Sequence, residues 1–472
     1  MRLLIPRLAV IAWLVCLLTL CGTRLGSAAE PTAKKNPDPM AGIEVLDLPT
    51  AAKIALSENP SLQAAQARVE QAAQVVKQAQ SAYWPQVDAF GGYQRQELSK
   101  NTYTLQYSAL NAYLSSIGQP TISNPEDYYQ VGLKATWLLF NGLAREFTLA
   151  AAKYGEKASA AARDDAQRLL LLGVASNYLQ GQLAKENVTI AKADEAFNQR
   201  LLTEAKLRYD VGTGPLSDVL NFQVRVNQAQ SQRIQQERIY RTNLISLAAL
   251  LGLPQGRLPE QVRLADLAPT TAEEQALPQV GPLVDMALSR RPDLQQSEWR
   301  VKQAEANVTT AKSGYYPTVA LNGDYTGERM NDMSFGSDDF GNSVGLGLNW
   351  NIFAGGLTRA KTGEANAVLM IAERGQDDTR LQITSDINLV TTQIGAAQEQ
   401  LTLQETNTQL VQQQRDLVEK EYKAGVGSLV RLNEAQRDLI VSQGQLALSR
   451  VGLRLLWYNL QASTGQILDT FK

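Results

Sequence analysis

The sequence predicts a mainly α-helical chain that contributes four β-strands to a transmembrane β-barrel shared with other chains. Three observations support this fold class. The chain of 472 residues contains two copies of one architectural half. Each half contains a helix that is too long for a compact globular domain. Each half also contains two strands in which apolar and small or polar residues alternate.

The duplication is clearest in two similar segments, "SAYWPQVDAFGGY" from Ser81 and "SGYYPTVALNGDY" from Ser313. Upstream, "NPSL" matches "RPDL" at the same offset of 232 residues. Downstream, "VGLKATWLLFNGLAR" matches "VGLGLNWNIFAGGLTR", and "YDVGTGPL" matches "YKAGVGSL", at an offset of 213. The first copy therefore has 19 extra residues between its strands. Repeats of this length are two halves of one fold rather than solenoid units.

Each repeat has the order helix, two strands, very long helix, turn, helix. We expect a first repeat over 43–251, a connector over 252–282 with several prolines, and a second repeat over 283–472. Residues that favour helices dominate at about 50–82, 143–210 and 218–251, and again at about 283–314, 357–424 and 428–465. The two helices of about 68 residues would extend roughly 100 Å. Helices of that length must pack against other long helices.

The four strands are expected at about 85–98, 127–140, 317–330 and 342–353. From Val344 to Ile352 every second residue is apolar, and the residues between them are Gly and Asn. Successive side chains of a strand point to opposite faces, and these strands have the length of tilted membrane-spanning strands. We therefore predict an apolar face toward lipid and a polar face toward a lumen. The alternative is a soluble sandwich with an aromatic core.

Aromatic residues gather where the helices meet the strands. Pro85 and Pro317 cannot continue a helix and suit the first residue of a strand. Amphipathic aromatic side chains are typical of a membrane–water interface. We predict that interface at Tyr83, Trp84, Trp137, Phe140, Tyr315, Tyr316, Trp350 and Phe353.

Four strands cannot close a membrane barrel, because about eight is the practical minimum. An unpaired strand edge is not viable in lipid. Several chains must therefore share one barrel. Two chains would supply eight strands and three would supply twelve, and both numbers are compatible with this reasoning.

Residues 1–29 have the layout of a secretory signal peptide. Arg2 and Arg7 precede an apolar run, and small residues lead to Ala29. A lipoprotein attached through Cys21 is the alternative, although the bulky Leu20 precedes that cysteine. Residues 30–42 are expected to be a disordered terminus of the mature chain.

Cleavage would remove both cysteines, and the sequence contains no histidine. Ser-His-Asp and Cys-His sites and imidazole metal ligands are therefore excluded, and we expect no cofactor. Cleavage also removes three arginines, which leaves 42 basic and 47 acidic residues. This balance gives no indication of a nucleic-acid partner.

The order of these features over about 43–467 resembles the TolC family of outer-membrane efflux factors. The resemblance implies a homotrimer in the outer membrane of a Gram-negative bacterium, with a 12-stranded barrel and a twelve-helix tunnel across the periplasm. It implies two further partners, a periplasmic adaptor (membrane fusion) protein and an inner-membrane transporter. The chain would be the exit duct of a tripartite efflux pump or a type I secretion system. The connector would lie in the equatorial region of the tunnel.

The resemblance also implies a periplasmic gate at the turns "VGTGPLSD" and "AGVGSLVR". Asp218 and Tyr422 correspond to residues that hold the tunnel closed in the family. Arg431 stands where some members have an acid, so we expect Asp218 and Arg431 to alternate around the trimer as salt bridges. Gly212 and Gly425 suit the left-handed end of a helix. The other tip residues expected are Tyr209, Gly214, Gly427 and Glu434.

Three functions follow from these features. The first is a passive export duct, and the second is an envelope-spanning structural or anchoring protein without an open lumen. The third is a carboxylate-dependent hydrolase using Asp164-Asp165 or Asp377-Asp378. Adjacent helix positions do not face one site, so we expect no enzyme. The polar strand faces favour the duct, and Ser99 to Asp127 is expected to be its cell-surface loop.

Overall fold

The computed structural model describes residues 40–271 and 273–471. The expected signal peptide, Cys21 and most of the segment 30–42 lie outside these residues. The described residues divide into a small unit, residues 40–46 with Pro259–Arg263, and a large unit that holds the others. In the described part of the small unit, the Arg263 amide donates a hydrogen bond to the Glu44 carbonyl at 2.9 Å. This bond belongs to the pairing of β1 (Val45–Leu46) with β4 (Arg263–Leu264).

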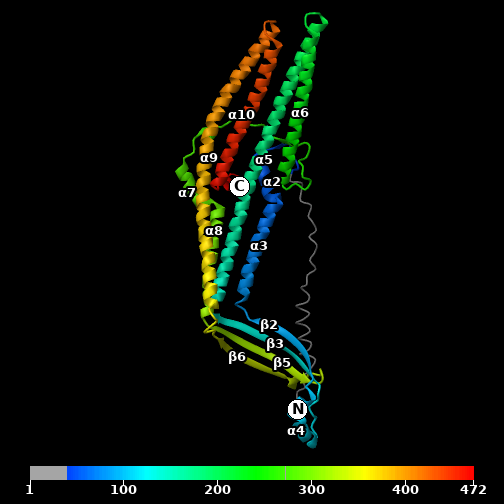
Figure 1. The fold of residues 1–472 in the computed structure, drawn as a ribbon, viewed down its shortest axis with the longest axis vertical. Coiled ribbons are helices and arrows are strands. Elements are labelled where there is room, and N and C mark those ends of the chain that lie inside the picture. Colours follow the sequence, from blue (N-terminus) through cyan, green and yellow to red (C-terminus); the bar gives the residue numbers. More distant parts are fainter. Residues whose placement is uncertain (1–39, 272, 472) are drawn as a thin grey trace. The chain divides into compact units, whose positions relative to one another are not determined.

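Two helical hairpins dominate the large unit. The long helices α5 (Ala144–Asp210) and α9 (Leu357–Lys423) each span 67 residues, and their partners α6 (Leu216–Leu250) and α10 (Leu429–Ser463) each span 35. Figure 1 shows α6 returning beside α5, and α10 beside α9. Because α10 also packs against α5, the four helices follow the order α6, α5, α10, α9. A short helix, α11 (Ile467–Thr470), ends the described chain.

Each helical stretch expected before the strands is in fact two helices. The first is α2 (Leu48–Glu58) and α3 (Pro60–Ser81), and the second is α7 (Val280–Arg290) and α8 (Pro292–Lys312). The expectation of one continuous helix is wrong because a proline starts the second helix of each pair. Proline lacks an amide hydrogen and pushes the preceding residue to extended geometry. Helices α3 and α8 lie on either side of α5, and α8 also contacts α9.

The four longer strands form one antiparallel sheet in the order β2-β3-β5-β6. Their bounds are Gln86–Gln96, Glu126–Asn141, Thr318–Met330 and Phe340–Asn349. The last strand is four residues shorter at its end than the expected 342–353. Its partner β5 begins at Thr318, which pairs with Asn349, and Pro317 has no amide hydrogen to extend the ladder. Trp350 and Phe353 therefore follow the strand.

The register places the apolar positions of all four strands on one face. Val87 pairs with Ala135, which pairs with Gly323, which pairs with Val344. The next row on the other face is Asp88, Lys134, Asp324 and Ser343. The apolar face is open to the surroundings, with Val344 at 79% and Leu346 at 69% exposure. In the described chain β2 and β6 each have one neighbour, so both edges of the sheet are unpaired.

The segment between β2 and β3, which covers the expected cell-surface loop, is partly helical. It contains helix α4 (Lys100–Ser116), which Ser99 caps by accepting a hydrogen bond from the Thr102 amide. The chain that follows α4 is held by Asn111, whose side-chain amide donates to the Ile122 carbonyl at 3.1 Å. The segment expected as a cell-surface loop therefore contains a helix, whose backbone is satisfied by local capping and by these side-chain bonds. The matching segment of the second repeat has only the short 3-10 helix η3 (Ser337–Asp339).

The connector between the repeats contains β4 and the 3-10 helix η1 (Glu273–Gln275), and a further 3-10 helix, η2 (Ser313–Tyr315), precedes β5. Glu274 anchors the connector to α10: its carboxylate accepts from Arg454 Nε at 2.7 Å, and its carbonyl accepts from Trp457 Nε1. Arg454 lowers the pKa of Glu274 against the opposing effect of burial.

Over the described residues, no helix combines the length and the apolar character needed to cross a membrane.

Candidate gate and membrane collar

The two turns at the ends of the long helices have the same backbone geometry. Gly212 and Gly425 have φ of +76° and +78°, a left-handed conformation that glycine adopts without strain. After α5, the Thr213 amide donates to the Arg208 carbonyl, and the Gly212 amide donates to the Tyr209 carbonyl. The amides of Val426 and Gly425 make the same two bonds after α9. Both helices thus end in a Schellman motif.

Gly214 and Gly427 are needed for close packing. A Cβ added to Gly427 would lie 2.9 Å from the Tyr422 nitrogen, and one added to Gly214 would lie 3.0 Å from the Arg208 Cβ. The chain therefore turns back directly against the helix it has just left.

The structure brings Asp218 and Tyr422 together. The Tyr422 hydroxyl donates to Asp218 Oδ2 at 3.4 Å, which links the start of α6 to the end of α9. Tyr422 packs edge-on against Phe222, with ring centroids 6.3 Å apart, and the Arg208 guanidinium lies 5.5 Å from the Tyr422 centroid. Burial raises the pKa of Tyr422, and the Asp218 carboxylate adds to this shift. The hydroxyl therefore stays protonated and able to donate.

A hydrophobic cluster lies beneath this contact and joins all four long helices. Phe222 and Leu432 are fully buried in it, beside Phe197, Leu201 and Val418. The tips of the two hairpins consequently have a shared core. The polar contact between Asp218 and Tyr422 lies over that core and adds to the apolar packing that holds the tips together.

Arg431 does not meet an acid of α6 within the chain. Its Nη1 lies 3.4 Å from Glu421 Oε2, across its own turn, and both side chains are well exposed. Tyr209, the counterpart of Tyr422 in the duplication, is exposed, and Glu434 is also exposed. The two repeats are therefore unequal at the tip.

The aromatic residues expected at the membrane interface form two equivalent contacts. Trp137 Nε1 donates to the Tyr83 carbonyl at 3.0 Å, and Trp350 Nε1 donates to the Tyr315 carbonyl at 3.2 Å. The Arg145 guanidinium stacks 4.3 Å from the Tyr83 ring centroid. The other aromatic residues of this collar are exposed: Trp84, Phe140, Tyr316 and Phe353.

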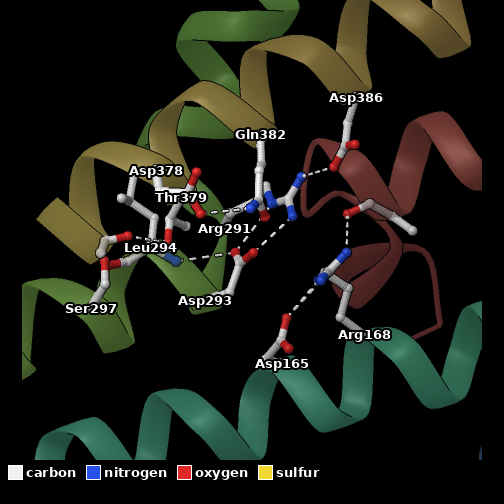
Figure 2. A network of polar contacts seen from close by, with 12 residues as sticks. Asp165, Arg168, Arg291, Asp293, Leu294, Ser297, Asp378, Thr379, Gln382 and Asp386 are labelled. Carbon is white, nitrogen blue, oxygen red and sulfur yellow. Dashed lines mark hydrogen bonds and ion pairs between the residues drawn. The ribbon is translucent and has the colours of Figure 1, made fainter.

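A polar network fixes the junction of α7 and α8 (Figure 2). The Arg291 guanidinium, 6% exposed, binds both carboxylate oxygens of Asp293 and also Asp386 on α9 at 3.1 Å. Burial opposes ionisation of Asp293, but Arg291 outweighs it and holds the pKa of Asp293 below its usual value. Arg168 on α5, paired with Asp165, donates to the Ala462 carbonyl near the end of α10.

Sequence reasoning missed a second polar contact between the hairpins. Asp194 on α5 accepts from Gln436 Nε2 on α10 at 2.8 Å and from Asn198 Nδ2 at 3.1 Å. Burial raises the pKa of Asp194 despite these donors. The Gln436 Oε1 atom is buried without a hydrogen-bond partner. Nothing in the local sequence marks Asp194, because its partner lies 242 positions away.

Three of the four acids considered for hydrolysis pair with arginines, and the fourth, Asp378, accepts from Gln382 Nε2 at 2.7 Å. Asp164 pairs with Arg163 and Asp165 with Arg168, while Asp377 pairs with Arg374. Within residues 40–271 and 273–471, no group of three or more His, Cys, Asp or Glu residues is placed to hold a metal ion.

A sheet with one apolar face and open edges, joined through an aromatic collar to paired helical hairpins, defines a membrane duct of the efflux type. The sequence profile of the family described as "Outer membrane efflux protein" matches residues 51–253 and 283–466. The chain belongs to this outer-membrane family.

Known relatives and structures agree with this assignment. The chain is 27% identical, over 87% of its length and 82% of the relative's, to the pyoverdine export outer membrane protein OpmQ of Pseudomonas aeruginosa. It is 21% identical, over 88% of its length and 90% of the relative's, to the outer membrane protein TolC of Vibrio cholerae. The solved outer-membrane channel OprN has the same fold, with a TM-score of 0.73 at 21% identity and 89% of each chain covered.

Proposed function

We propose that the chain is one third of a passive outer-membrane exit duct. The observation that carries this proposal is the four-stranded sheet, which has an apolar outer face, a polar inner face and two unpaired edges. Three copies would supply twelve strands and close the barrel, which removes every edge from lipid.

The helical layer supports the same assembly. Helix α9 is at one side of the four-helix layer and α6 at the other. On α9, Leu403, Leu410 and Leu417 repeat every seven residues and are exposed; on α6, Leu220 and Val224 are exposed. Exposed apolar stripes at heptad spacing are typical of helix–helix contacts. A head-to-tail contact of α9 with α6 of the next copy closes into a ring.

The partners proposed are a periplasmic adaptor protein and an inner-membrane transporter, which would supply the energy. The chain itself would perform no catalysis, as the occupied acid pairs suggest. The relative OpmQ is named as a pyoverdine export protein, and another relative, AprF of Pseudomonas aeruginosa, is named as an alkaline protease secretion protein. Both small molecules and proteins are therefore candidate cargo for a duct of this kind.

The gate proposed is the contact between Asp218 and Tyr422, with Arg208 and the two glycine turns around it. A hydrogen bond of 3.4 Å is long, and a part-buried contact of this kind stabilises the closed state by about 0.5 to 1.5 kcal/mol. Three copies would together favour closure by a few kcal/mol, which a docked partner can reverse. Asp218 and Arg431 of neighbouring copies can add exposed ion pairs of about 0–1 kcal/mol each.

Single-channel conductance in planar bilayers tests the duct and its gate. The purified trimer should conduct, and D218A combined with Y422F should increase its open probability about tenfold or more. R437Q is the matched control, since Arg437 is exposed on α10 and pairs with its neighbour Asp438, and it should leave conductance unchanged. A trimer that never conducts, wild type or variant, would contradict the duct and favour an anchoring protein without a lumen.

A further inference from the structure

A groove runs along α5 in the half of the helical layer nearest the sheet. Helices α3 and α8 form its walls, and its volume is about 570 Å³. The floor is made of small residues of α5 at helical spacing, including Gly155, Ser159 and Ala162. A Cβ on Gly155 would lie only 3.2 Å from Gln303 Nε2, so the floor has little room for larger side chains.

The two walls carry the same polar residues because of the duplication. Arg68 and Gln71 on α3 correspond to Arg300 and Gln303 on α8, and all four line the groove. Arg163 also lines it and is paired with Asp164. No acidic residue lines the groove. Among the described residues, neither Arg68 nor Arg300 has a carboxylate oxygen within 4.0 Å.

The groove is formed within one chain. Its two walls belong to the same chain, and α5 lies between them. A second cavity continues it toward the sheet and shares Val75, Ala152 and Gln303 with it. That cavity reaches Asn141, which pairs with Thr318 on the polar face of the sheet. The groove is therefore continuous with the face that we assign to the lumen.

We propose that this groove binds oxyanions, the carboxylate or phosphate groups of cargo molecules. A guanidinium presents two parallel donors that match either group, and the paired glutamines add neutral donors beside them. The volume is in the range of sites for small organic ligands. In a trimer the groove would occur three times at one level, which places six unpaired arginines around the path. That location rests on the proposed duct, but the binding itself does not.

Calorimetric titration of the detergent-solubilised protein tests the binding. The probes are citrate, a tricarboxylate, and inorganic pyrophosphate. The variant R68Q/R300Q should raise the dissociation constant at least tenfold, because two charge-assisted contacts are lost. The control K153Q/K302Q removes two positive charges from α5 and α8 that do not line the groove, and it should change the constant less than twofold. Binding should weaken as KCl is raised from 0.1 to 1 M, as expected for exposed charges.

The two probes separate the possible sources of the ligand. Citrate binding alone assigns carboxylate cargo, and pyrophosphate binding alone assigns phosphate cargo. The inference is overturned if neither probe binds the wild type, or if R68Q/R300Q and K153Q/K302Q bind equally well. If the double variant gives no folded protein, R68Q and R300Q are each expected to weaken binding about threefold. A protein that binds citrate but never conducts would support oxyanion binding in the groove and contradict the proposed function as a duct.

Discussion

Replacement of Arg291 by methionine should open the α7–α8 junction locally. Arg291 is 6% exposed and neutralises Asp293 through two hydrogen bonds of 2.7 and 3.1 Å. Removal of one partner of a buried ion pair costs about 3–5 kcal/mol, because the other charge is left unpaired. Asp293 keeps the Leu294 amide and some contact with solvent. We therefore expect R291M to reduce the local stability of the junction by about 3 kcal/mol, at the low end of that range.

Hydrogen exchange measured by mass spectrometry is the suitable assay, because it reports local opening without requiring reversible unfolding of a trimer. A loss of about 3 kcal/mol corresponds to roughly 150-fold faster exchange. The amide of Gln295, which donates to the Arg291 carbonyl at 3.2 Å, lies in the peptide to follow.

The neighbouring residue provides the control. Arg290 also forms an ion pair, with Asp469 at 3.1 Å, but its side chain is 52% exposed. R290M should reduce the local stability by about 0–1 kcal/mol, the usual value for a surface ion pair. Equal exchange rates in R290M and R291M would refute the reasoning, because burial would then not distinguish the two pairs.

Three further outcomes are expected. Because the folded chain holds the pKa of Asp194 above its unfolded value, ionisation of this group weakens the fold as pH rises from about 4 through the folded pKa. D194N should therefore raise the melting temperature at pH 7.5 but not at pH 3.5, and an equal effect at both values would argue against it. A Cβ on Gly132 would lie 2.6 Å from the Tyr325 carbonyl oxygen, so G132V should greatly reduce trimer recovered from membranes. G345V, with open space around its Cβ, should not; equal recovery of the two variants would contradict this. Finally, S115C in α4 should react with a membrane-impermeant maleimide on intact cells, while S231C in α6 should react only after permeabilisation; the reverse pattern would invert the proposed topology.

The repeats, the long helices and the strand faces could be predicted from the sequence because each depends on local periodicity. Apolar residues at every second position specify one face of a strand wherever that strand lies. The aromatic residues before each proline could likewise be placed at the helix–strand junction. The broken helices at Pro60 and Pro292 were predictable from the proline itself, although the helix-forming composition around it concealed them.

Contacts between distant residues were decided by the tertiary structure alone. Local pattern gives no information on a bond such as that between Asp194 and Gln436, because its energy depends on which helices pack together. The register of β5 against β6 likewise fixed where the last strand ends, at Asn349. The groove lined by Arg68 and Arg300 depends on both the sequence and the tertiary structure. The duplication made its walls alike, and the packing of α3 and α8 on either side of α5 brought those walls together.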